Sequence, residues 1–217
     1  PGVVGLRDRA TVAVLPFENL STVADGDVLA LGIAESVLHQ LANLQQLDVI
    51  SRTSSFNFRG RSEDAREIGR LLKANYLLEG SVQSDRTRLR ITTQLIDAKT
   101  GADVWSMRFD RRPSDVFAVQ DEIALQVTRA LELTLDENAM ARMKGQGTDN
   151  LDAYLAYLQA RTLLAGDRVA DVQQAIEQLQ RAEDGGEDRQ ADGRVEQRDD
   201  DVAQTLPACR RVDPRRP

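Results

Sequence analysis

A helical stripe of apolar residues between two short apolar runs constrains the fold of this chain more than any other feature of its sequence. Residues 11–17 and 47–50 are apolar runs with the length of buried strands. Between them, residues 27–44 carry apolar side chains at spacings of three and four: Ala30, Ile33, Ala34, Val37, Leu38, Leu41 and Leu44. A helix that joins two strands of one sheet normally makes them parallel, with a right-handed crossover. This region therefore predicts a strand–helix–strand unit.

Three further strands are predicted in close succession at residues 76–83, 88–96 and 102–109, with connections short enough for hairpins. The last two alternate apolar and polar side chains, so each should have one buried face. These faces comprise Leu89, Ile91, Thr93 and Leu95 in one strand and Trp105, Met107 and Phe109 in the next. Trp105 is thus predicted to lie in the core rather than to be an exposed recognition side chain.

Two more helices complete the domain. The first should begin after Ser62 as N-cap and end near Asn75, and it turns four apolar side chains inward: Ala65, Ile68, Leu71 and Leu72. The second should be capped by Ser114, and its stripe comprises Val116, Val119, Ile123, Val127, Ala130 and Leu131. Residues 52–60 show neither period and predict a loop. The fold class is α/β (α+β-like): a βαβαβββα mixed sheet with helices packed on it at residues 11–137, after a linker at 1–10.

A second, smaller unit is predicted after a linker at residues 138–149 that contains two glycines. Residues 150–183 predict an α-helical hairpin, in which Ala175, Leu179 and Ala182 have the spacing of the second helix of a tetratricopeptide repeat. One such repeat cannot bury its apolar face alone. We therefore expect the helix pair to pack on the helix at 116–131 or to self-associate.

The composition changes at residue 184. Residues 184–217 hold no aromatic residue and no isoleucine, and charged residues, Gly and Gln dominate, so this tail is predicted to be disordered. Two explanations stay open for it: a truncated or frame-shifted reading of a longer protein, or a natural acidic-basic linker.

Six ordered strings of this sequence resemble the TolB amino-terminal-like domain. They are VAVLPFENLS at residues 12–21, VISRTSS at 49–55, YLLEGSV at 76–82, QLIDAKTG at 94–101, Val104-Trp105, and FAVQDEIA at 117–124. The resemblance covers residues 11–135. It implies an α/β bacterial module that is followed by tetratricopeptide repeats. In that family, the module is commonly the C-terminal half of class III adenylate/guanylate cyclases, of membrane-anchored winged-helix regulators, or of some protein kinases.

The residues that most enzymatic sites need are too few in this chain. One cysteine, Cys209, and one histidine, His39, exclude a disulfide framework, a Cys/His zinc site and most catalytic triads. No glycine-rich loop follows a strand to hold phosphate. Glu35 lies one turn before His39, and we interpret the two as a solvated helix pair; Cys209 is interpreted as an inert thiol. No catalytic residue, metal ligand or cofactor is predicted.

One segment carries a candidate ligand or partner site. Arg52, Thr53, Ser54, Ser55 and Arg59 place polar donors directly after a strand, where open α/β sheets tend to bind ligands. The alternative is that these hydroxyl groups only satisfy the backbone of their own loop.

The charge balance limits the partners. With 28 basic and 35 acidic residues, the formal net charge of −7 argues against nucleic acid or an anionic membrane surface. No run approaches the roughly 20 apolar residues that span a bilayer, so no membrane contact is predicted within the chain. Because the chain begins with Pro1, we expect a fragment whose upstream part, with any anchor or targeting signal, is missing. Its location would be cytoplasmic, or periplasmic if a transmembrane segment precedes it.

Together these features predict a non-catalytic sensory or protein-interaction module of a bacterial signalling protein. It would contact a protein partner, or itself, through the helix pair. Two alternatives remain: the C-terminal regulatory fragment of a class III adenylate/guanylate cyclase, whose parent makes a cyclic nucleotide, and the periplasmic part of a membrane-anchored transcriptional regulator.

Overall fold

The computed structural model describes residues 9–23, 25–60, 63–85, 87–143 and 150–164, together with Ile176, Glu177 and Gln180. Its strands are β1 (Ala10–Val14), β2 (Glu18–Asn19), β3 (Leu47–Val49), β4 (Tyr76–Ser84), β5 (Leu89–Asp97) and β6 (Ala102–Arg111). Its α-helices are α1 (Gly26–Ala42), α2 (Arg52–Ser55), α3 (Ala65–Leu72), α4 (Val116–Ala130), α5 (Glu137–Met143) and α6 (Leu151–Leu164), with 3₁₀ turns at Phe56–Phe58 and Pro113–Asp115.

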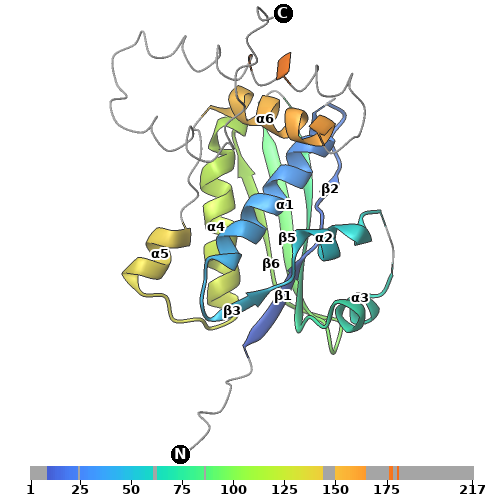
Figure 1. The fold of residues 1–217 in the computed structure, drawn as a ribbon, viewed down its shortest axis with the longest axis vertical. Helices are drawn as coiled ribbons and strands as arrows, with labels where there is room; N and C mark the ends of the chain where they lie inside the picture. The colour runs from blue at the N-terminus through green and yellow to red at the C-terminus, as the bar shows by residue number, and fades with distance from the viewer. Residues whose placement is uncertain are drawn as a thin grey trace, which may run out of the picture.

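The strands form one mixed sheet in the order β3-β1-β4-β5-β6, and the short β2 pairs with β4 (Figure 1). β1 lies parallel to both β3 and β4, as the helical crossovers require. β4, β5 and β6 form two successive antiparallel hairpins. The predicted mixed α/β sheet is confirmed, and β2 is an element that the sequence patterns did not indicate.

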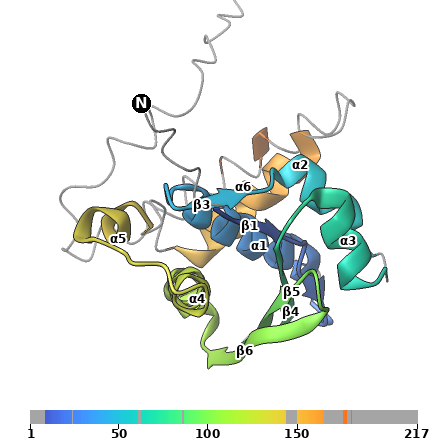
Figure 2. The same ribbon diagram turned by 90° about the horizontal axis from the view of Figure 1, so that it is seen from below.

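Helices cover the two faces of the sheet unequally. The main core lies between the sheet and helices α1 and α4, where Ile33, Ile91 and Ile123 are fully buried. A smaller cluster beneath α3, which includes Ile68 and Leu77, covers part of the opposite face (Figure 2). The rest of that face on β4, β5 and β6 carries polar side chains such as Gln94 and Thr92. β3 and β6 are the outermost strands of this order, and β2 pairs with β4 alone.

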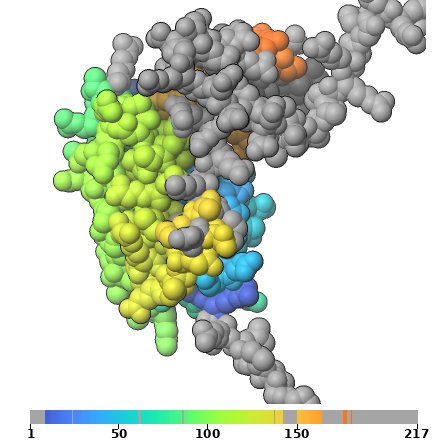
Figure 3. Space-filling view, turned by 90° about the vertical axis from the view of Figure 1, so that its left-hand side faces the viewer, coloured from blue at the N-terminus to red at the C-terminus, as the bar shows by residue number. Residues whose placement is uncertain are grey.

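Helix α5 occupies all of the described part of the range predicted as a linker, residues 138–143. Ala139 on this helix is buried in the main core. Figure 3 shows α5, in yellow, lying beside α4 and close to the blue N-terminal elements. Residues 144–149 of the predicted linker lie outside the described residues.

Three predicted helix boundaries are wrong. Ser62 lies outside the described residues, and Asp64 caps α3 by accepting a hydrogen bond from the backbone N–H of Arg66 at 2.8 Å. The left-handed residue after α3 is Lys73, with φ of 54°, whereas the Asn75 side chain accepts from the Thr11 backbone. Ser114 lies within the tighter 3₁₀ turn before α4, and its hydroxyl bonds to the neighbouring Asp115 side chain instead of capping a helix.

Two side-chain predictions can also be compared with the structure. Trp105 and Met107 are partly buried and pack on the main core, on the predicted face of β6. Leu71, in contrast, is 53% exposed, because α3 contacts the sheet through the narrower stripe around Ile68.

Only the first helix of the predicted pair at 150–183 is described as a whole: it is α6. Of its predicted partner, Ile176, Glu177 and Gln180 are described as helical, and the other residues lie outside the described set, as do residues 1–8 and the predicted disordered tail at 184–217. Within the described ranges, no helix combines the length and the apolar character that crossing a membrane requires.

Candidate functional site

The segment predicted as a partner-binding loop is a short helix. The hydroxyl of Ser51 accepts a hydrogen bond from the backbone N–H of Ser54, which caps α2, and a 3₁₀ turn follows directly. Helix α2 has only four residues, which is too short for a helical period to show in the sequence. The loop prediction for residues 52–60 is therefore wrong for most of the segment.

The structure separates the five candidate residues. Thr53 and Ser54 lie on the surface, whereas Ser55 is fully buried, and its hydroxyl has no hydrogen-bond partner. Arg59 pairs with Asp27 on α1 at 3.2 Å. Arg52 pairs with Glu35 on α1 at 3.1 Å, and its guanidinium also lies over the ring of Phe56. Both arginines are thus already bound to carboxylates of α1.

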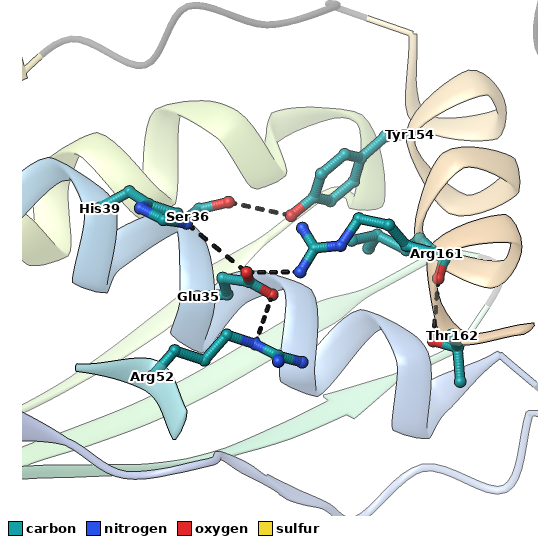
Figure 4. Close-up of polar contacts among 8 residues, drawn as sticks. Glu35, Ser36, His39, Arg52, Tyr154, Arg161 and Thr162 are labelled. Atoms are coloured by element: carbon teal, nitrogen blue, oxygen red, sulfur yellow. Dashed lines mark hydrogen bonds and ion pairs between the residues drawn. The ribbon is translucent and has the colours of Figure 1, made fainter. Parts of the chain in front are cut away.

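Glu35 is the centre of a junction between three helices (Figure 4). One oxygen of its carboxylate pairs with Arg161 of α6 at 2.5 Å and with His39 at 3.5 Å, and the other oxygen pairs with Arg52 of α2. The residue is only 7% exposed. A buried carboxylate without such cations would pay a large desolvation cost. Glu35 therefore holds α2 and α6 in place against α1.

The predicted pair of Glu35 and His39 exists, but only His39 is solvated, with 66% of its side chain exposed. The interpretation of Glu35 as a surface residue is wrong, because α6 covers this side of α1. One signal in the sequence could have indicated that contact: Gly32 and Ser36, one turn apart, are small residues of the kind that allow two helices to approach closely.

Tyr154 joins α6 to a second helix of the domain. Its hydroxyl lies 3.1 Å from the Ser36 hydroxyl and accepts a hydrogen bond from the Gln120 amide of α4 at 3.2 Å. Its ring meets Phe117 of α4 edge-on, with ring centres 5.1 Å apart. Burial raises the pKa of the Tyr154 phenol above its usual value, although the hydrogen bonds to Ser36 and Gln120 oppose this shift.

Gly32 marks a close approach between α1 and α6. A Cβ atom at this position would lie 2.3 Å from a methyl carbon of Leu158 and 3.0 Å from the Tyr154 hydroxyl. Nearby, the Gln159 amide donates to Asp25 at 2.6 Å. Hydrogen bonds, an ion pair and close packing together hold α6 against the α/β domain.

This junction is arranged for positioning rather than for proton transfer. Arg52, Arg161 and His39 occupy the Glu35 carboxylate, whereas a general base needs a free oxygen within reach of a substrate. Cys209, the only thiol, lies outside the described residues. In the described part of the chain, no group of three or more His, Cys, Asp or Glu side chains could hold a metal ion.

The sequence of residues 8–126 matches a family described as the HilA/YgeH-like transcriptional regulator, second domain. This match covers more than half of the chain. The chain belongs to this family. The matched residues of this HilA/YgeH-like domain run from β1 into α4, so that Glu35 and Arg52 lie inside the match and Arg161 lies beyond it.

A longer relative extends past the family match. A protein of Rhizobium meliloti (strain 1021) named "Putative adenylate cyclase 3" is 37% identical over 156 residues, which make up 72% of this chain and 27% of that protein. The HilA/YgeH-like chain thus spans about a quarter of the length of this relative. The family and the relative together indicate a signalling or regulatory module.

Several solved structures are similar to this HilA/YgeH-like domain at low sequence identity. TolB from Acinetobacter baumannii is 14% identical with a TM-score of 0.44, and the similarity covers 56% of this chain and 28% of TolB. Lipoprotein GNA1162 from Neisseria meningitidis is 16% identical with a TM-score of 0.41, over 56% and 99% of the two chains. The C-terminal domain of LpoB from Salmonella enterica is 20% identical with a TM-score of 0.40, over 48% and 83%.

Replacing Glu35 tests whether the junction stabilises the fold. We expect Glu35→Ala to lower the free energy of unfolding by about 1–3 kcal/mol, because it leaves Arg161 and Arg52 without their shared carboxylate. His39→Ala removes an exposed member of the same cluster and should change stability by less than about 0.5 kcal/mol. Urea unfolding of the three proteins measures both effects. Equal losses in the two variants would contradict the central role of Glu35.

The phenol of Tyr154 should titrate at a higher pH than an ordinary tyrosine. Its raised pKa means that the folded state holds this proton more tightly than the unfolded state does. Any stability from it is present below the unfolded value of about 10 and is lost as the pH rises through the folded value. Absorbance at the tyrosinate band should show one late phase, which Tyr154→Phe removes. A late phase that persists in Tyr154→Phe would show that another tyrosine is responsible.

Proposed function

We propose that this chain is a non-catalytic regulatory module in which α6 reports the state of the α/β domain to the helices that follow. The ion pair between Glu35 and Arg161 is the observation that carries the proposal, because it fixes α6 to α1 through a buried charge. Arg52 shares the same carboxylate. A change at α2 that withdraws Arg52 would therefore alter the electrostatic hold on α6.

The proposal that this chain has no enzymatic activity is supported by its chemistry. Its buried carboxylate, Glu35, is occupied by Arg52, Arg161 and His39, so neither oxygen is free to act as a general base. An activity of the full-length protein would then reside in another part of it.

The name of the Rhizobium meliloti relative favours one candidate for that activity. In this candidate, the chain is the C-terminal regulatory part of a class III adenylate/guanylate cyclase, and the full-length protein makes a cyclic nucleotide. The second candidate is supported by the family name: a transcriptional regulator, of which this chain is the periplasmic part if a membrane anchor precedes it. The sequence of the adjoining coding region distinguishes the two, since a cyclase domain and a winged helix have different motifs.

A protein is the partner that we propose, bound through α6 and the helix after it. The resemblance to a tetratricopeptide repeat supports this, because such helix pairs stack on further helices. Tyr157 of α6 is 43% exposed, and Ile176 is also exposed, so apolar side chains remain available for a protein or a second copy of the chain. The net charge of −7 argues against nucleic acid as a partner.

The absence of catalysis can be tested directly. We expect the purified 217-residue chain, mixed with ATP or GTP and either Mg²⁺ or Mn²⁺, to form no cyclic nucleotide and to hydrolyse no nucleotide above the buffer blank. Chromatography of the reaction mixture measures both products. Turnover that a single substitution in this chain abolishes would refute the proposal.

The coupling between α6 and the domain can be tested at Gly32. We expect Gly32→Ala to force the Leu158 side chain out of its present position and so to loosen the contact of α6 with α1, because the added methyl group overlaps the Leu158 methyl groups. Amide hydrogen exchange should then accelerate across residues 151–164 and stay unchanged in β4 and β5. The double variant Gly32→Ala/Leu158→Ala removes the overlap, and its effect should be smaller than the sum of the single effects. Unchanged exchange in Gly32→Ala, or additive effects in the double variant, would contradict a rigid α1–α6 contact.

A further inference from the structure

A cationic pocket lies on the side of the sheet away from the Glu35 junction. Its volume is about 580 Å³, and it opens where β1 and β4 begin and β5 ends. The residues that line it are Arg9, Ala10, Arg66, Gly69, Arg70, Ala74, Asn75, Tyr76, Asp97, Ala98 and Lys99. This volume is within the range of small-molecule sites.

The charge of this pocket is opposite to that of the whole chain. Arg9, Arg66, Arg70 and Lys99 supply four cationic side chains, and Asp97 supplies one carboxylate. One oxygen of Asp97 already accepts hydrogen bonds from the backbone N–H groups of Lys99 and Thr100. The lining thus has an excess of cations in a protein of net charge −7, and three of the four are balanced in part by carboxylates beside the pocket: Arg9 by Asp48, Arg66 by Asp64 and Arg70 by Glu67.

Two of the guanidinium groups are held in matching orientations. Arg66 and Arg70 lie one turn apart on α3, and each binds a carboxylate of that helical segment through its Nε and Nη2 atoms: Arg66 binds Asp64, and Arg70 binds Glu67. A guanidinium has five N–H groups, so three remain on each arginine after these two bonds. The carboxylates themselves do not line the pocket. The Arg66 contact lowers the pKa of Asp64 to about 2, so this ion pair persists at neutral pH.

Close packing fixes the distance between α3 and Lys99. A Cβ atom on Gly69 would lie 2.3 Å from the Cβ of Ala98, so α3 packs tightly against the turn between β5 and β6. That turn carries Lys99, which lines the pocket together with the arginines, and it ends at Gly101, whose φ of 75° favours glycine. Arg66 and Arg70 therefore belong to a helix that packs directly on the turn that carries Lys99.

A second pocket of similar volume is also rich in arginine, but its lining includes the carboxylates that pair with those arginines. It is lined by Thr87, Arg88, Arg90, Asp110, Arg111, Arg112 and Asp115. There, the carboxylates of Asp110 and Asp115 are themselves part of the lining, and they pair with Arg90 and Arg112. An anion in that pocket would meet two competing carboxylates.

We infer that the pocket between α3 and the β5–β6 turn binds the phosphate groups of a small molecule. Phosphate oxygens accept several charge-assisted hydrogen bonds at once, which suits paired guanidinium groups and a lysine around one space. Free pyrophosphate and the diphosphate of a nucleotide share this chemistry.

Titration with inorganic pyrophosphate at low ionic strength, followed by calorimetry and by the amide NMR signals of residues 97–101, tests the inference. We expect saturable binding by the 217-residue chain, weakened by added salt. Lys99→Glu changes an exposed side chain and should weaken binding by about tenfold or more, since it replaces an attraction with a repulsion. Arg66→Gln/Arg70→Gln should have a similar effect. Arg88→Gln, in the second pocket, serves as the matched control and should bind as the unchanged chain does.

The outcomes separate the inference from general electrostatic attraction. No saturable binding of pyrophosphate by the unchanged chain would overturn it, as would unchanged binding in Lys99→Glu or equal weakening in Lys99→Glu and Arg88→Gln. A parallel titration with adenosine diphosphate distinguishes the two sources of phosphate. Tighter binding of the nucleotide than of pyrophosphate would indicate contacts to the base or ribose, and equal or weaker binding would indicate that the phosphates alone are recognised.

Discussion

The position of α6 depends on one buried negative charge. Moving the Glu35 carboxylate out of water is costly, and the structure offsets that cost by bringing arginines from α2 and α6, and His39 from the next turn of α1, to its two oxygens. Helix α1 therefore has two different contact surfaces. Its apolar face packs on the sheet through residues such as Ile33, and its polar side receives α6. A single helix thus connects the core of the domain with the helix that follows it.

The sequence patterns predicted the sheet because its elements are long or strictly periodic. The stripe of α1 and the alternation in β5 each extend over several repeats, and both were confirmed. The junction was harder to predict. α2 is too short to show a period, and Glu35 is buried by a helix more than 110 residues away in the chain. The spacing of apolar residues indicates which face of a helix packs on the sheet. It says little about another helix that packs on the polar face, as α6 does on α1.

The family match and the junction overlap only in part. Glu35 and Arg52 lie within the residues that match the HilA/YgeH-like family, whereas Tyr154 and Arg161 lie beyond them. The domain thus contains half of the contact, and α6 supplies the other half. A buried carboxylate on the domain would stay poorly compensated without that helix. Coupling through this junction therefore needs both the α/β domain and α6, and neither provides it alone.

The two edges of the sheet bear on how this protein behaves at high concentration. Unpaired backbone groups at the edge of a sheet can accept a strand from another molecule and so begin aggregation. Here β3 is only three residues long, which leaves little backbone to pair. β6 is ten residues long, but Arg108, Asp110 and Arg111 place charges along its exposed length. Both edges therefore resist the addition of a foreign strand, one by its shortness and the other by its charge.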